Sequence, residues 1–241
     1  MSKIKSVSED SSVEYAPGSA AEEMLALGTN QFRTVLADPP WRFQNRTGKM
    51  APEHKRLSRY GTMPLEEIME LPVAQIVQDK AHLYLWVPNA LIAEGLEVMH
   101  RWGFTYKTNI VWYKIRKDGG PDGRGVGFYF RNVTELILFG TRGTNNRTLE
   151  PGRTQTNVIV SRKREHSRKP DEQYDLVERC SPGPYLEMFA RHHRPGWTQW
   201  GNEAPTIENI ESTPKPIKFG WQDLTKEEVE EEAQMSLIEA S

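Results

Sequence analysis

The chain has 241 residues, of which 37% are hydrophobic, and a formal net charge of −2 at pH 7. It shows no apolar run of about 18 residues and no basic-then-apolar leader, so we expect neither a membrane span nor a secretory signal, and a cytoplasmic location. The single cysteine, Cys180, excludes an internal disulfide and a zinc site built from cysteines.

Charge separates along the chain. Residues 31–202 hold 26 bases and 18 acids, a net charge of +8, whereas residues 203–241 hold ten acids and three bases. A basic central part is typical of proteins that bind a polyanion such as nucleic acid. We expect a flexible N-terminal segment over 1–30, one domain over 31–204 and an acidic C-terminal extension over 205–241.

Short apolar runs predict buried strands, and amphipathic spacing predicts helices between them. In chain order the expected elements are a short helix near 20–27, a strand over 32–37, helices after Pro64 and Pro72, a strand over 81–87, a helix over 89–101, strands over 105–115 and 134–139, a helix from Lys169, and strands over 185–189 and 197–200. Residues 42–60 are expected to form a long basic loop, and residues 142–169 a basic connector. This alternation predicts a layered α/β fold with a largely parallel sheet.

The most specific motif is Asp38-Pro39-Pro40-Trp41, at the carboxyl end of the first predicted strand. Open α/β sheets bind ligands at this edge. The prolines stiffen the turn and leave the carbonyls of Asp38 and Pro39 free as acceptors. Two acceptors aimed at an aromatic amine favour the pyramidal form that can attack, and Trp41 offers a surface on which a base can stack. The alternative interpretation is a proline-rich turn capped by a core tryptophan.

A second group of candidate ligands follows the last two predicted strands. It consists of the blocks Glu187-Met188-Phe189-Ala190-Arg191-His192-His193 and Gly196-Trp197-Thr198-Gln199-Trp200-Gly201-Asn202-Glu203. Acids and amides at such strand ends can bind ribose hydroxyls and a purine edge, and the alternative is ordinary core strands with a surface turn. The Gly-rich segment 119–127 lacks the ending of a phosphate-binding loop. The adjacent His192 and His193 point in opposite directions on extended backbone, so we expect no metal site.

Five short motifs occur in a fixed order along the chain. They are Asp38-Pro39-Pro40-Trp41, Tyr60-Gly61-Thr62-Met63, Lys169-Pro170-Asp171-Glu172, Glu187-Met188-Phe189-Ala190-Arg191 and Gly201-Asn202-Glu203. Over about residues 32–204, the ordered set resembles the MT-A70 family of S-adenosylmethionine-dependent adenine-N6 methyltransferases. The resemblance implies a Rossmann-like methyltransferase fold of the circularly permuted type, with the catalytic motif before the cofactor-binding motif and helices flanking a mostly parallel sheet.

The resemblance also implies roles for single residues. The catalytic turn is Asp38, Pro39, Pro40 and Trp41, and the substrate-binding residues are Trp41, Tyr60 and Lys169. The residues implied for binding S-adenosyl-L-methionine are Asp38, Lys169, Glu187, Arg191, His193, Asn202 and Glu203. The chain departs from the family at Ala190 and Arg194, where many relatives have Gly and Asn.

We therefore expect an enzyme that methylates the N6 amine of adenine in DNA. The chain lacks the cysteine-rich zinc modules of the large messenger-RNA enzymes, and so resembles a compact, bacterial or phage-like member. RNA is the alternative substrate. An alternative of another class is a non-catalytic nucleic-acid-binding partner of an active homologue, although such a partner should have a degraded catalytic turn. The sequence leaves a homodimer or a heterodimer open.

Overall fold

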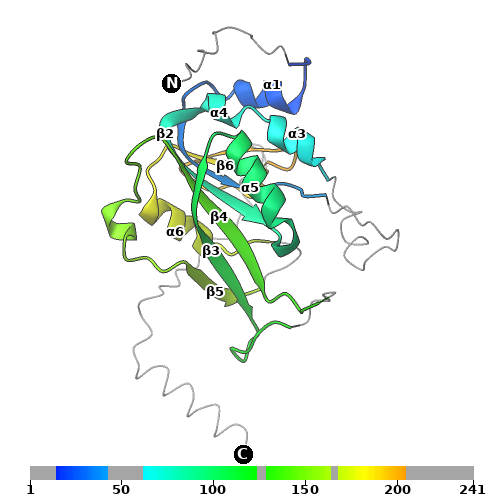
Figure 1. Ribbon diagram of the computed structural model, residues 1–241, viewed down its shortest axis with the longest axis vertical. Helices are drawn as coiled ribbons and strands as arrows, with labels where there is room; N and C mark the ends of the chain where they lie inside the picture. The colour runs from blue at the N-terminus through cyan, green and yellow to red at the C-terminus, as the bar shows by residue number, and fades with distance from the viewer. Residues whose placement is uncertain (1–14, 43–61, 124–128, 164–167, 205–241) are drawn as a thin grey trace, which may run out of the picture. The chain divides into compact units, whose positions relative to one another are not determined.

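The computed structural model describes residues 15–42, 62–123, 129–163 and 168–204. These residues build one seven-stranded sheet with the order β5-β3-β4-β2-β1-β6-β7 (Figure 1). Tyr60 and most of the predicted loop 42–60 lie outside the described residues, as does the predicted acidic extension 205–241. The proposed domain limits therefore remain predictions.

Six of the seven strands overlap the predicted strands, and β5 was not predicted. The strands of the sheet are β1 (Phe32–Ala37), β2 (Val77–Val87), β3 (Thr105–Ile115), β4 (Thr134–Arg142), β5 (Val158–Arg162), β6 (Tyr185–Met188) and β7 (Trp197–Trp200). The strand β4 is antiparallel to β2 and β3, and the other pairings are parallel. The mostly parallel sheet that we predicted is confirmed. The carboxyl ends of the parallel strands consequently share one edge with the beginning of β4.

Short helices connect the strands. They are α1 (Ala20–Leu25), α3 (Leu65–Glu70), α4 (Val73–Ile76), the 3-10 helix η1 (Asn89–Leu91), α5 (Ile92–Arg101), the 3-10 helix η2 (Glu150–Gly152) and α6 (Glu172–Cys180). The helix α1 occupies the predicted position in the N-terminal segment, where it buries Met24 completely. None of the helices in the described ranges has the length and apolarity to cross a membrane.

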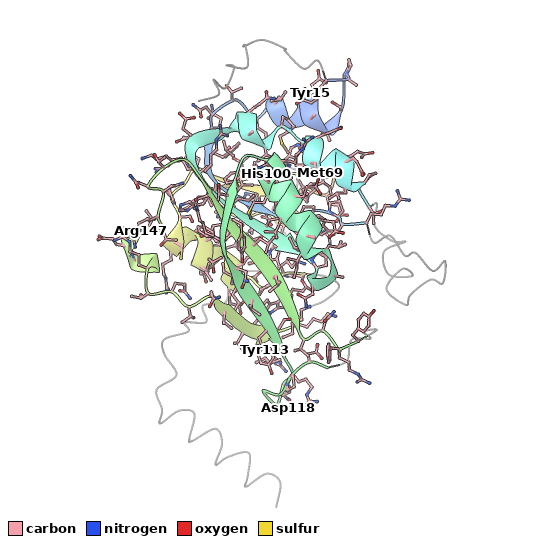
Figure 2. The ribbon with its side chains drawn as sticks, in the orientation of Figure 1. Tyr15, Met69, His100, Tyr113, Asp118 and Arg147 are labelled. Atoms are coloured by element: carbon pink, nitrogen blue, oxygen red, sulfur yellow. The ribbon has the colours of Figure 1, made fainter. Side chains whose placement is uncertain are left out.

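The sheet separates two hydrophobic cores. Because side chains alternate along a strand, Val35 and Leu85 face α1, α3, α4 and α5, whereas Leu36 and Trp86 face α6. On the first face α3 packs against α5, and Figure 2 shows Met69 and His100 on these two helices. The helix α6 covers the second face, so that the fold has three layers.

Two local predictions are wrong. The predicted basic connector 142–169 contains η2 and the edge strand β5, in which Ile159 is fully buried and the other side chains are partly or fully exposed. A five-residue edge strand with one buried side chain gives little hydrophobic pattern to detect. The helix predicted from Lys169 begins only at Glu172, because Pro170 and Asp171 form the turn before it.

Candidate active site

The register of the sheet places several polar side chains on the face that α6 covers. Leu36 pairs with Glu187, and Trp112 pairs with Glu135. Asp38 comes two residues after Leu36, so the strand alternation directs it to the same face. Asp38 and Glu187 also lie at the carboxyl edge of the sheet, where α/β folds bind ligands.

The ammonium of Lys169 lies between two carboxylates. Its Nζ is 3.3 Å from Asp38 Oδ1 and donates a hydrogen bond of 2.8 Å to Glu135 Oε2. It also lies 4.8 Å from the centre of the Trp86 ring, within the range of a cation–π contact. The other oxygen of Glu135 accepts a hydrogen bond from Lys114. Acids and bases therefore alternate from Asp38 to Lys114 across three strands and the segment before α6.

These contacts set the charge of each group. Burial raises the pKa of Asp38, and the charge of Lys169 only partly opposes this. Burial would also raise the pKa of Glu135, but Lys169 and Lys114 lower it to about 2. Burial disfavours the charged form of Lys169, yet Asp38 and Glu135 raise its pKa above the ordinary value. Lys169 is thus a fixed cation and Glu135 a fixed anion, and Asp38 is the acid that gains a proton more readily.

Internal hydrogen bonds hold the turn after β1. The amide of Trp41 donates to the Pro39 carbonyl at 2.8 Å, and the amide of Met63 donates to the Pro40 carbonyl at 2.9 Å. The prediction of a free Pro39 carbonyl is therefore wrong, because the tight turn directs the Trp41 amide back to it. A carbonyl oxygen has two lone pairs, so Pro39 keeps one for a further donor.

Trp41 belongs to the core. It is 6% exposed, and its indole Nε1 donates to the Trp86 carbonyl at 2.9 Å. This contact ties the turn to the end of β2. Burial fits the alternative interpretation of a core tryptophan, because little of the ring is open in this conformation. Its stacking on a base remains a prediction.

The loops after β6 and β7 lie side by side. The Ala190 amide donates to the Trp200 carbonyl at 3.1 Å. Gly201 has φ +141°, and a Cβ at this position would lie 2.8 Å from the Cα of Phe189, so only glycine fits without a shift. This approach brings Arg191 Nε to 3.4 Å from Glu203 Oε2. Two of the predicted cofactor ligands thus meet.

Glu187 has an unusual environment for an acid. Its Oε1 accepts a 2.8 Å hydrogen bond from the Tyr174 hydroxyl, whereas its buried Oε2 has no hydrogen-bond partner among the described residues. Burial raises the pKa of Glu187 to about 7, the Tyr174 hydrogen bond opposes this shift, and the charge of Asp38 adds to it. A buried carboxylate oxygen without a donor fits a ligand that brings its own donor, such as a sugar hydroxyl.

Arg194 turns away from these groups and toward α6. Its Nε and Nη2 donate to the two oxygens of Glu178 at 2.9 and 3.0 Å, and its guanidinium lies 4.6 Å from the centre of the Tyr174 ring. The departure from the family pattern at this position therefore serves packing of α6. His193 is partly exposed and Asn202 is exposed on the neighbouring loops.

Replacing Arg194 with Ala should lower the free energy of unfolding by about 1.5–3 kcal/mol, because a two-pronged hydrogen bond to a carboxylate is lost. Urea denaturation measures this change. Arg153→Ala is the matched control, since the Arg153–Glu150 pair is largely exposed and should contribute less than about 1 kcal/mol. Equal effects of the two substitutions would contradict this account of Arg194.

Sequence reasoning missed three residues of the site: Glu135, Lys114 and Tyr174. Each looks locally like an ordinary polar residue of a strand or a helix. One usable signal was present, since Lys114 and Glu135 are opposite charges at the facing ends of consecutive predicted strands. Within the described ranges no three His, Cys, Asp or Glu side chains gather in a way that could hold a metal ion.

The chain is similar in sequence to several known proteins. A profile of the MT-A70 family matches residues 32–203. The N(6)-adenosine-methyltransferase MT-A70-like protein of Arabidopsis thaliana is 35% identical over 193 residues, which cover 78% of this chain and 25% of that protein. The N(6)-adenosine-methyltransferase catalytic subunit METTL3 of Homo sapiens is 32% identical over 185 residues, 75% of this chain and 30% of that protein.

A bacterial relative matches this chain over most of its own length. The type II methyltransferase M.MunI of Mycoplasma sp is 27% identical over 195 residues, which cover 74% of this chain and 80% of that protein. The chain thus spans less than a third of the two adenosine methyltransferases and most of the type II methyltransferase.

Proposed function

The chain belongs to the MT-A70 family, so we propose that it is an S-adenosylmethionine-dependent methyltransferase that acts on the N6 amine of adenine in DNA. The observation that carries this proposal is the Asp38 carboxylate, held beside Lys169 in the hydrogen-bonded turn at the carboxyl edge of the sheet. The choice of DNA is supported by the match to 80% of the type II methyltransferase.

The site suits the cofactor. The buried Glu187 Oε2, which has no partner among the described side chains, suits a ribose hydroxyl. The Asp38 carboxylate suits the amino group of the methionine part, and the Lys169 ammonium suits its carboxylate. The residues that we propose for cofactor binding are Asp38, Lys169, Glu187, Arg191, His193, Asn202 and Glu203. When bound, the cofactor supplies a methyl group activated by a positively charged sulfur.

The protein's own residues would prepare the amine. The N6 amine is a poor nucleophile because its lone pair is delocalised into the ring. Asp38 and the remaining lone pair of the Pro39 carbonyl accept its hydrogens, which favours the pyramidal form and stabilises the positive charge that develops on nitrogen. Lys169 and Trp41 fix Asp38 and the turn in place, so that catalysis comes mainly from positioning and electrostatics.

The raised pKa of Glu187 gives a pH dependence. A carboxylate accepts hydroxyl donors better than a carboxylic acid does, so the Kd for S-adenosylmethionine should fall as pH rises through about 7. The free energy of unfolding has the opposite pH dependence. The pKa of Glu187 in the folded protein exceeds the ordinary value of 4.5, so the contribution of Glu187 to stability is fully present below pH about 4.5 and is lost as the pH rises through about 7. Isothermal titration calorimetry at several pH values measures the first effect.

The Glu187→Gln variant is the control for this pH dependence. Its amide does not titrate, so its Kd should lack the change near pH 7 that Glu187 produces. A wild-type protein with a pH-independent Kd would show that the Glu187 carboxylate does not contact the cofactor.

RNA is a second candidate substrate. The printed names of the Arabidopsis and human relatives are those of N(6)-adenosine methyltransferases, and both are more than 30% identical to this chain. The third candidate, a non-catalytic partner of an active homologue, conflicts with the intact Asp38-Pro39-Pro40-Trp41 turn.

One experiment separates the three candidates. Labelled methyl transfer from S-adenosylmethionine to matched DNA and RNA pools is followed by digestion to nucleosides and mass spectrometry. N6-methyldeoxyadenosine alone supports the proposed DNA activity, and N6-methyladenosine alone replaces DNA with RNA. Cofactor binding without product in either pool supports the partner interpretation.

A further inference from the structure

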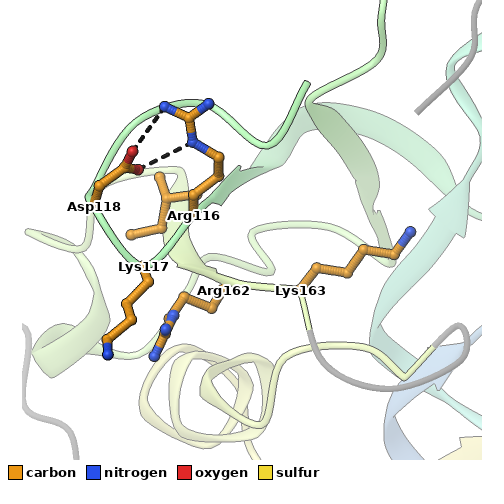
Figure 3. A pocket seen from close by; sticks show the side chains of 6 residues that line it. Arg116, Lys117, Asp118, Arg162 and Lys163 are labelled. Carbon is orange, nitrogen blue, oxygen red and sulfur yellow. Dashed lines mark hydrogen bonds and ion pairs between the residues drawn. The ribbon is translucent and has the colours of Figure 1, made fainter. Parts of the chain in front are cut away.

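A basic surface lies at the ends of β3 and β5, outside the residues assigned above to the cofactor and the amine. Arg116 and Lys117 follow β3, whereas Arg162 ends β5 and Lys163 follows it. Ile115 pairs with Arg162, so the four cations come from adjacent strand ends, and with Asp118 they line a cavity of about 560 Å³. Figure 3 shows Lys117 and Arg162 extending in the same direction and Lys163 pointing away from them. We call Arg116, Lys117, Arg162 and Lys163 the basic edge.

The basic edge carries excess positive charge. Arg116 is occupied by Asp118, to which its Nε and Nη2 donate at 3.0 and 2.8 Å. Lys117, Arg162 and Lys163 are exposed and form no ion pair with an acid in the described part of the chain. Three cations around one opening suit a ligand with several negative charges, such as successive phosphodiesters.

The basic edge adjoins a charged residue of the candidate active site along β3. Lys114 lies one residue before Ile115, and its hydrogen bond to Glu135 connects it to Lys169 and Asp38. The charge of Lys163 is also one of the influences that lower the pKa of Lys114. The basic edge and the charged groups of the candidate active site are therefore neighbours at the end of β3.

Two highly exposed aromatic side chains lie in the segment between β3 and β4. Tyr129 is 94% exposed and Phe130 is 84% exposed, whereas the other exposed large hydrophobic residues are 36–40% exposed. We call Tyr129 and Phe130 the aromatic pair.

Hydrogen bonds fix the backbone next to the aromatic pair. Arg131 Nη1 donates to the Gly123 carbonyl at 3.0 Å, and the Asp122 amide donates to the Lys114 carbonyl at 2.9 Å. The segment before Thr134 is thereby held against the turn that follows β3. The pair precedes β4, in which Glu135 is the second residue, so it flanks the active site along the chain.

We propose that the basic edge and the aromatic pair bind the unpaired DNA strand next to the target adenine, with phosphates on Lys117, Arg162 and Lys163 and bases stacked on Tyr129 and Phe130. This inference rests on the proposed function. Cations that follow a backbone, next to aromatic rings, are the recurrent means of binding single strands. Within a duplex the faces of the bases are already stacked, so the aromatic pair distinguishes an unpaired strand from a paired one.

The experiment measures binding of the full chain to a short fluorescent DNA strand and to the same strand in a duplex, by anisotropy at several salt concentrations. Tyr129→Ala with Phe130→Ala should weaken single-strand binding by at least about tenfold and leave the salt dependence unchanged, since stacking is lost but no cation. Lys117→Ala with Arg162→Ala should reduce the slope of log K against log salt by about 0.7 for each cation removed.

Matched controls come from the opposite end of the strands. Tyr106 is the second residue of the same strand β3 and is 40% exposed, so Tyr106→Ala controls for loss of a surface aromatic. Lys80→Ala with Lys107→Ala removes two exposed lysines near the amino ends of β2 and β3. These controls should bind as the wild type does, and unchanged thermal unfolding shows that every variant is folded.

The outcomes separate this proposal from the proposed function. Unchanged single-strand affinity in the Tyr129→Ala, Phe130→Ala variant overturns the inference. It does so also if this variant dissociates an oligomer, because the aromatic pair would then hold subunits together and not bind DNA. Equal weakening of duplex and single-strand binding also overturns it. If the wild type binds single-stranded DNA as expected but transfers no methyl group, the proposed binding surface is supported and the proposed methyltransferase function is contradicted.

Discussion

Asp38→Ala should abolish methyl transfer while the protein still binds nucleic acid, and Asp38→Asn should lower kcat by about 100- to 1,000-fold. The smaller change keeps the size of the side chain but removes the charge that accepts the amine hydrogens and stabilises the developing positive charge on nitrogen. Removal of one such preorganised group typically costs this much in kcat. Steady-state transfer of labelled methyl to DNA measures kcat, and anisotropy measures DNA binding separately.

Asp79→Asn is the matched control for Asp38→Asn. Asp79 is an exposed acid in the first half of β2, at the other side of the sheet from the candidate site. It should leave kcat and binding unchanged. Because Asp38 is also proposed to contact the cofactor, the Kd for S-adenosylmethionine must be measured with each variant. Wild-type kcat in Asp38→Asn at saturating cofactor would refute the role of Asp38 in the chemical step.

The sequence predicts best those elements whose local pattern agrees with their burial. The ranges predicted for β1 and β3 match the structure, because each is an apolar or β-branched run bounded by polar or glycine-containing turns. The strand β2 begins four residues before its prediction, at Val77. Its first part contains exposed Asp79 and Lys80, and the pairing of Val77 with Phe32 of β1 marks its beginning. Such pairing is invisible to a local pattern.

The residues of the candidate site likewise divide into those that the sequence indicated and those that it did not. The motif order indicated that Asp38 and Lys169 belong together, and the structure places their charged atoms 3.3 Å apart. Glu135 was not predicted, because its role depends on β4 running antiparallel to its neighbours. That direction brings the beginning of β4 to the edge where the other strands end. Topology therefore decides which charges meet, and the sequence pattern shows only that strands are present.

Arg194 illustrates a third case. The resemblance to the family identified Arg194 as a departure from the family pattern, but it did not show what the larger side chain contacts. The structure gives it partners on α6, including both oxygens of Glu178. It also packs on Tyr174, the donor to Glu187. A substitution beside a ligand site can thus affect the site through the helix that covers it.

The second large effect concerns the cation between the two acids. Lys169→Met should lower kcat at neutral pH by about 100-fold or more, because Asp38 and Glu135 would lose their shared counter-charge. The charge of Lys169 lowers the pKa of Asp38, so its removal must raise that pKa further. If the Asp38 carboxylate is the active form, the rate falls as pH drops through its pKa, and the acid limb of the rate profile must move to higher pH in Lys169→Met. A pH–rate profile of kcat measures this shift.

Loss of Lys169 has two consequences: Asp38 loses a neighbouring positive charge, and the negative charge of Glu135 loses its counter-charge. Glu135→Gln separates these two consequences. The charge of Glu135 also raises the pKa of Asp38, so the double variant Lys169→Met, Glu135→Gln should have its acid limb at lower pH than Lys169→Met alone. Residues in direct contact give non-additive effects in such a cycle, whereas independent residues give additive ones. Lys169→Arg keeps the positive charge and should leave the acid limb near its wild-type position. A Lys169→Met enzyme with an unshifted acid limb would show that Lys169 does not control the protonation of Asp38.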